Sequence, residues 1–427
     1  MTTEYIDRSI APPVHEMHHL QLPVPQTEAL SNGIDFYILK GGSQEVMQLS
    51  FTWQGGIAEA RVPAIARLTS ILMPEGTVSR SGAQISEALD FHGAMLRIVA
   101  EQHTTTLTVT VLSHMASDVL PIIEDVITHP VFDEQKFETF RGMEVQNLLL
   151  AQSKVSVLAS EALDKLIKGN DNPCARIPTV EDIESLTVED IRDFYRQLVT
   201  SDKCMVFLSG NFSDDIYIKV REMVESLPFR GKAMDMAVEP YRAEAPQTVV
   251  IGKPDAVQAA INIGIPAPPR SNPDYIPLRF AAIALGGYFG SRLMKNIRED
   301  KGYTYGIASY LLGSREGSYL TVTAQTDKSY VGDVIREVSH EIEALASAPM
   351  DNDELKRLRQ HISMSLMEIL DSPFAIMDHY KVIKSVGLPQ GYFEHQVECL
   401  ESLSADLIME MARKYMLVPQ MRIAVCQ

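Results

Sequence analysis

The side chains best suited to metal chemistry lie in VHEMHHLQLP, residues 14–23. His15-Glu16-Met17-His18-His19 fits the pattern H-E-x-x-H, in which two histidines hold zinc and the glutamate acts on the bound water. That chemistry requires a helix, because one helical turn brings residues four apart to the same face. Pairs of prolines before and after the segment disfavour such a helix. We predict an extended N-terminal arm and keep an active zinc enzyme using His15 and His19 as an alternative.

A second polar group falls on an expected strand. Glu101 and His103 are two residues apart, and His92 precedes them. Residues two apart on a strand share a face, so a metal ion is one way to use them. Polar residues along a strand edge are the commoner pattern, and this is what we predict here.

Composition excludes several functional classes. The chain of 427 residues has a formal net charge of −18, which argues against nucleic acid as a partner. We find no apolar run long enough to cross a membrane and no secretory signal at the start, so we expect a cytoplasmic protein. The four cysteines are widely scattered and indicate free thiols in a reducing compartment.

The chain repeats itself once. LTVT occurs at 107–110 and again at 320–323, an offset of 213 residues. The stretch at 185–210, a capped amphipathic helix followed by a short apolar strand, resembles the stretch at 402–427, an offset of 217. Two matches in the same order at nearly the same offset indicate two homologous domains.

We place the first domain at 1–227, a linker at 228–247 and the second domain at 248–427. Strands and helices are grouped in each half rather than strictly alternating, which predicts an α+β class with a mostly antiparallel sheet covered by helices. The expected order is a strand pair, a helix, a hairpin, further helices, and a capped helix with a final strand. The paired ranges are 34–54 and 247–266, 62–73 and 274–298, and 94–112 and 303–325.

Two stretches resemble the pitrilysin or insulinase family of zinc metallopeptidases, the inverzincins. LSNGIDFYIL (30–39) is similar to the family's opening strand, and GGYFGSRLMKNIREDKGYTYGIASY (286–310) is similar to its second-half signature. The resemblance covers nearly the whole chain. It implies two α+β halves and a peptidase lineage.

The resemblance fails where the family binds zinc. Active members carry H-x-x-E-H before a Gly-Thr pair. Alignment on Gly76-Thr77 places Arg67 and Ile71 at the histidine positions and Ser70 at the glutamate position. Arginine and isoleucine offer no lone pair to a metal, so we predict no metal and no cofactor bound by this chain. Glu144 is a candidate remnant of the family's third ligand.

The other catalytic element of the family is present. The resemblance implies that Arg298 and Tyr305, seven residues apart, hold a substrate carbonyl and stabilise the oxyanion. The local pattern predicts a helix that ends at Gly302, then a strand with Tyr303, Tyr305 and Ile307 on one face. Alternatively, Arg298 only complements the helix C-terminus and Tyr305 only packs.

These observations lead to one functional hypothesis. We predict a non-catalytic subunit of a heteromeric peptidase, which encloses unfolded peptides and offers Arg298 and Tyr305 to zinc bound by a homologous partner. Gly93, Ala94, Met95 and Leu96 match the region where the family adds substrate as an extra strand. The alternative is a scaffold or peptide-binding protein of the same fold with no part in catalysis.

Overall fold

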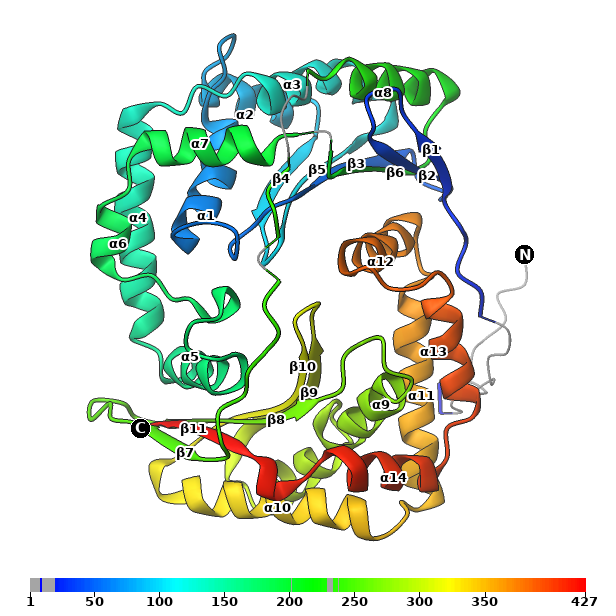
Figure 1. Ribbon diagram of the computed structural model, residues 1–427. Coiled ribbons are helices and arrows are strands. Elements are labelled where there is room, and N and C mark those ends of the chain that lie inside the picture. Colours follow the sequence, from blue (N-terminus) through cyan, green and yellow to red (C-terminus); the bar gives the residue numbers. More distant parts are fainter. Residues whose placement is uncertain (1–7, 10–19, 201, 229–232, 237) are drawn as a thin grey trace.

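The computed structural model describes residues 8–9, 20–200, 202–228, 233–236 and 238–427. The histidine-rich motif at 15–19 lies outside the described residues. Figure 1 shows two halves, each with a sheet and covering helices, joined by a long connection. Within the described part of the chain, no helix combines the length and apolarity needed to cross a bilayer.

The first half is built on a six-stranded sheet with the order β1-β2-β6-β3-β5-β4. Only β2 and β6 pair in parallel, and the other neighbours are antiparallel. The strands are β1 (Gln26–Ala29), β2 (Asp35–Lys40), β3 (Val46–Gln54), β4 (Met95–Ala100), β5 (Thr104–Leu112) and β6 (Cys204–Gly210). The helices are α1 (Pro63–Leu72), η1 (Met73–Glu75), α2 (Gly82–Phe91), η2 (Ser113–Met115), α3 (Ala116–Thr128), α4 (Glu134–Gln152), α5 (Val155–Lys168), η3 (Pro173–Ala175), α6 (Val180–Glu184), α7 (Val188–Leu198) and α8 (Asp214–Ser226).

The second half has a five-stranded sheet with the order β7-β11-β8-β10-β9. Here β7 and β11 pair in parallel, and the other pairs are antiparallel. The strands are β7 (Thr248–Ile251), β8 (Ala259–Ala267), β9 (Thr304–Gly313), β10 (Ser318–Thr326) and β11 (Arg422–Cys426). The helices are α9 (Tyr275–Gly286), η4 (Met294–Asp300), η5 (Lys328–Tyr330), α10 (Val331–Ser347), α11 (Asn352–Glu368), α12 (Pro373–Val386), α13 (Tyr392–Glu401), α14 (Ala405–Tyr415) and η6 (Val418–Gln420).

The predicted α+β class and the duplication are confirmed, because both halves run through the same order of strands, hairpin and helices. One expectation is wrong: the helix predicted at 274–298 is two helices, α9 and η4. Helix α9 ends at Gly286, and the need for a glycine at this position is steric. A Cβ on Gly286 would come 2.7 Å from the Ser309 Cβ, so only glycine allows the end of α9 to lie this close to β9.

Each half lends one helix to the sheet of the other. Helix α5 packs on β8 and β11, where a Cβ on Gly264 would lie 2.8 Å from the Leu163 side chain. Helix α12 packs on β6 and β2. It is the third α-helix after the β9–β10 hairpin, just as α5 is the third after the β4–β5 hairpin. Its Lys381 Nζ donates to Ser50 Oγ at 2.9 Å. The exchange is visible in Figure 1, where α12 lies beneath the first sheet and α5 beside the second.

Candidate functional site

Helix α1 carries the positions at which the family's zinc motif would stand. It begins with Pro63 at its first turn, where proline costs no hydrogen bond, and it buries most of its residues. Ser70 is 4 % exposed, and its hydroxyl donates to the Ala66 carbonyl at 3.0 Å. Ile71 points away from the core and is 39 % exposed.

Arg67 is held by the residue predicted as the remnant ligand. Its Nε lies 2.5 Å from Glu144 Oε1, although the two residues are 77 positions apart. Glu144 is the one buried carboxylate of α4, and Arg67 is about one-third exposed. The Arg67 guanidinium therefore neutralises the Glu144 carboxylate, whose charge would otherwise be available to a metal ion. The residues present do not fit zinc, because the one suitable ligand is already paired and its neighbours cannot ligate.

Arg298 lies in the last turn of η4, a π-helical segment of seven residues. Leu293 and Ile297 are fully buried on its inner side, and Gly302 ends the segment with φ +66°, as the sequence predicted. The Arg298 guanidinium lies over the ring of Phe289, 5.1 Å from its centre. No ion pair or hydrogen bond holds this guanidinium among the described residues, so the helix presents a cation without a counter-ion. Single π-helical turns often occur at functional sites.

Tyr305 sits on a β-bulge at the start of β9. Ala324 pairs with Ile307 and Thr326 pairs with Thr304, so two residues of β9 face one of β10. The Thr304 hydroxyl fixes the bulge by donating to the Gln325 carbonyl at 2.6 Å. The predicted alternation is wrong here because the bulge shifts the pattern: Ile307 is 3 % exposed and Tyr305 is 90 % exposed. The side chain is thereby turned out of the core.

A cavity of about 690 Å³ adjoins Tyr305. Its walls come from β8, β9 and β10 and from the start of α5, so residues of both halves contribute. Ser156, Ser160 and Gln325 supply polar groups to its lining. This volume lies within the range of ligand-binding sites.

The predicted peptide-binding segment is divided by the structure. Met95 and Leu96 begin β4, the edge strand of the first sheet, and Met95 is 75 % exposed. Gly93 precedes the strand in a left-handed turn with φ +60°, and Ala94 is buried. Only the second pair therefore belongs to an edge that an extended peptide could join.

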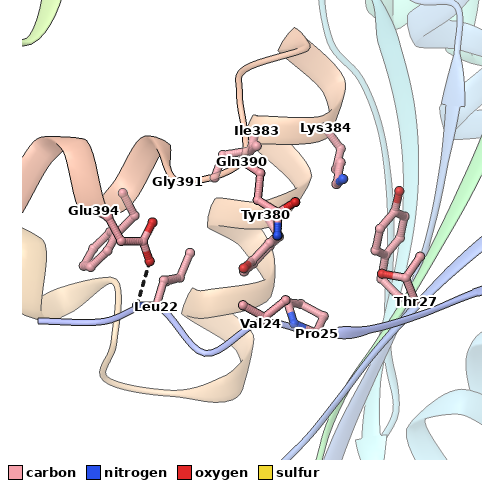
Figure 2. A pocket seen from close by; sticks show the side chains of 12 residues that line it. Leu22, Val24, Pro25, Thr27, Tyr380, Ile383, Lys384, Gln390, Gly391 and Glu394 are labelled. Carbon is pink, nitrogen blue, oxygen red and sulfur yellow. Dashed lines mark hydrogen bonds between the residues drawn. The ribbon is translucent and has the colours of Figure 1, made fainter.

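A smaller cavity of about 90 Å³ lies where the N-terminal segment crosses α12 and α13. Figure 2 shows Val24 and Pro25 running past Tyr380 and Ile383, with the Glu394 carboxylate bonded to the chain. The backbone N–H of Leu22 donates to Glu394 Oε1 at 3.4 Å. This segment ties the first half to the second and leaves little room for a ligand.

In the structure, the side-chain partners of His103 are not Glu101 and His92, the two residues considered with it in the sequence. Glu101 is exposed and accepts from the Thr104 hydroxyl, and His92 contacts Phe91 edge to face. His103 instead meets Glu59, Cys174 and Glu316, three residues that sequence reasoning did not connect. One signal was available: the LTVT offset of 213 residues relates position 103 to position 316.

Comparisons with known proteins agree with this architecture. Residues 59–168 match the family model described as insulinase, peptidase family M16, and residues 185–362 match that of the peptidase M16 inactive domain. A solved structure of a peptidase M16 inactive domain from Pseudomonas fluorescens has a TM-score of 0.86 and 19 % identity, covering 94 % of this chain and 98 % of that one.

Two bacterial relatives carry different descriptions. An uncharacterized zinc protease, YmxG of Bacillus subtilis, is 22 % identical over 324 residues, which is 75 % of this chain and 78 % of that protein. A non-peptidase homolog of Helicobacter pylori is 24 % identical over 267 residues, which is 61 % of this chain and 60 % of that protein. With two models of one family matching stretches that together cover most of the chain, the chain belongs to the insulinase family of peptidases, M16, and residues 185–362 match its inactive domain.

Proposed function

We propose that this chain is the non-catalytic subunit of a heteromeric zinc peptidase. Its role is to enclose unfolded peptides and to place Arg298 and Tyr305 beside zinc held by a homologous partner. The observation that carries the proposal is the contrast between a neutralised metal position at Arg67 and two donors elsewhere, a half-buried Arg298 without an ion pair among the described residues and an exposed Tyr305.

The pair has the chemistry of an oxyanion site. A guanidinium and a phenol hydroxyl both donate hydrogen bonds, and both favour negative charge that develops on a carbonyl oxygen. Among the described residues Arg298 makes no ion pair or hydrogen bond, and Tyr305 is almost fully exposed, so neither must break such a bond to meet substrate. The donors accelerate nothing alone, because the attacking water would come from the partner's zinc.

Two further features support peptide binding. The β4 edge offers unpaired backbone groups to an extended chain, and Met95 is exposed beside them. The cavity next to Tyr305 is lined by small apolar side chains such as Ala260 and Ala308 and by polar ones such as Ser156 and Gln325, which suits a substrate held without strict side-chain selection.

The test begins by expressing the chain with a homologue from the same organism that carries H-x-x-E-H. The complex is purified and assayed on an unfolded peptide. We expect Arg298→Ala and Tyr305→Phe to lower kcat by about 100-fold or more, as removal of an oxyanion donor does, with a small change in KM.

The matched controls are Tyr310→Phe, an exposed tyrosine of the same strand, and Arg336→Ala, a surface arginine paired with Asp333. Both should leave turnover unchanged. A complex that forms but is indifferent to Arg298 would establish the scaffold function instead. Failure of the two chains to associate, or zinc-dependent cleavage by the isolated chain that His15→Ala abolishes, would overturn the proposal.

A further inference from the structure

The two equivalent hairpin turns of the duplicated fold meet at a buried cluster. His103 ends the β4–β5 turn, and Glu316 lies in the β9–β10 turn at the corresponding position of the repeat. Their side chains approach to 2.7 Å between His103 Nε2 and Glu316 Oε1. Cys174, from η3 between α5 and α6 of the first half, brings its Sγ to 3.5 Å from the same nitrogen.

We infer that this cluster is a structural zinc site, with His103, Cys174 and Glu316 as ligands. Imidazole nitrogen, thiolate and carboxylate are the three ligand types that zinc accepts in proteins. One ligand atom from each residue lies within 4.8 Å of the others, and no other group of the described residues meets that condition. The inference is independent of the proposed function, because the site lies on other elements than Arg298 and Tyr305.

The geometry is close to that of a tetrahedral ion. Zn–N and Zn–S bonds of about 2.0 and 2.3 Å place nitrogen and sulfur about 3.6 Å apart, and the observed separation is 3.5 Å. Zn–O bonds would require His103 Nε2 and the Glu316 oxygen to separate by about 0.6 Å, which rotation of the carboxylate provides. The fourth position remains for the second Glu316 oxygen or for water.

The neighbours of the ligands orient them toward the same point. His103 Nδ1 lies 2.7 Å from Glu59 Oε1, and Glu59 is anchored by the backbone N–H of Gly56 at 2.9 Å. A carboxylate on the far nitrogen of a histidine is the usual support of a zinc ligand, because it leaves the other nitrogen free of a proton. The Cys174 backbone is fixed by Asn172, whose Oδ1 accepts from its N–H at 2.9 Å.

Glu316 supplies an independent indication. Its side chain is fully buried; Oε1 lies 2.7 Å from His103 Nε2 without hydrogen-bond geometry, and Oε2 has no hydrogen-bond partner among the described residues. A buried carboxylate without satisfied oxygens is costly unless a cation meets it. The buried thiol of Cys174 completes a set of three zinc ligand types around one point.

A proton on His103 is the competing occupant. Burial alone lowers the pKa of His103. The contacts with Cys174, Glu316 and Glu59 raise it by more than burial lowers it, and the net pKa is about 11. An imidazolium between the carboxylates would therefore persist at neutral pH in a metal-free chain. The experiment must therefore distinguish a protonated His103 from a His103 that binds a metal ion.

The full-length chain is loaded with Zn²⁺, dialysed and analysed for metal, then loaded with Co²⁺ as a spectroscopic probe. We expect about one equivalent of metal per chain and a thiolate-to-cobalt charge-transfer band in the near ultraviolet. Cys174→Ser should remove the band, and Glu59→Gln should weaken metal affinity about 10- to 100-fold, as loss of a supporting partner does.

Cys399→Ser is the matched control. Cys399 is also buried and lies 3.8 Å from a histidine nitrogen, that of His395, but the adjacent carboxylate of Glu398 is exposed. This variant should keep both the metal and the band, as should His15→Ala, which tests the histidine-rich arm. A wild-type chain that gives no thiolate band with Co²⁺ overturns the inference, as does a band that survives Cys174→Ser.

Discussion

The two regions that the sequence resemblance relates to the family's catalytic machinery differ in how their charges are balanced. In the first half, Arg67 faces Glu144 at 2.5 Å, and Ser70 is turned back onto its own helix. In the second half, Arg298 rests on an aromatic ring and Tyr305 projects from a bulge into solvent. The first region is closed by an internal ion pair, whereas Arg298 and Tyr305 make no ion pair among the described residues and stay available to a substrate, as the proposed function requires.

The largest effect expected from this comparison is the return of a metal site in the first half. Arg67→His combined with Ile71→His would place two imidazoles one turn apart on α1, facing Glu144. We expect zinc affinity to rise at least roughly 1,000-fold at this position. Isothermal titration calorimetry measures this affinity in a Cys174→Ser background, so that zinc bound by His103, Cys174 and Glu316 does not contribute to the signal.

Adding Glu144→Gln to that double variant tests the third ligand. The affinity should fall again, because an amide is a poor zinc ligand. Equal affinity with and without Glu144 would show that this residue is not the remnant of the family's site.

A lower pH should reduce the free energy of unfolding of the chain, independently of the two regions compared above. Burial lowers the pKa of His379 to about 4, with a contribution from Arg279. Since the unfolded pKa is about 6.5, protons bind the unfolded chain first, and stability present above pH 6.5 is lost as pH falls toward 4. We expect a loss of about 2 kcal/mol, allowing for partial exposure. Urea unfolding of His379→Gln should show a flatter profile over this range, and an unchanged profile would exclude His379 as the source.

Breaking the pair in the first half should cost less. Arg67→Ala leaves Glu144 buried without its partner, and we expect the free energy of unfolding to fall by about 1–2 kcal/mol, since Arg67 is partly exposed. Arg67→Met with Glu144→Leu should recover most of that loss, because an apolar pair removes both charges. Denaturation at pH 8 measures both. A stable Arg67→Ala variant would contradict the view that the pair closes the old site.

The smallest effect is expected in the second half. Tyr305→Phe and Arg298→Ala should each change the stability of the isolated chain by less than about 1 kcal/mol, because Tyr305 is exposed and Arg298 loses only its contact with the Phe289 ring. Arg292→Ala is the contrast: its Nε and Nη2 donate to Glu354 at 2.6 and 2.9 Å, and it should lose about 2 kcal/mol. A large loss for Tyr305→Phe would assign that residue a structural role.

Local patterns predicted what depends on neighbours in the chain. The duplication, the α+β class, the helix over Arg67 and the end of η4 at Gly302 all follow from periodicity, capping and glycine. The same patterns failed at Tyr305, where a bulge depends on pairing with Gln325 in another strand. They also failed at 274–298, where α9 ends at Gly286, packed closely against β9, before the next helical segment begins.

The sequence by itself determined that two similar halves exist and that Arg67, Ser70 and Ile71 cannot hold zinc, because ligand chemistry is a property of residue type. Only the tertiary structure decided that Glu144 pairs with Arg67 and that α5 and α12 exchange sheets. It also brought His103, Cys174 and Glu316 together. Such contacts join residues tens to hundreds of positions apart, and they depend on how whole sheets and helices pack rather than on the order of neighbouring residues.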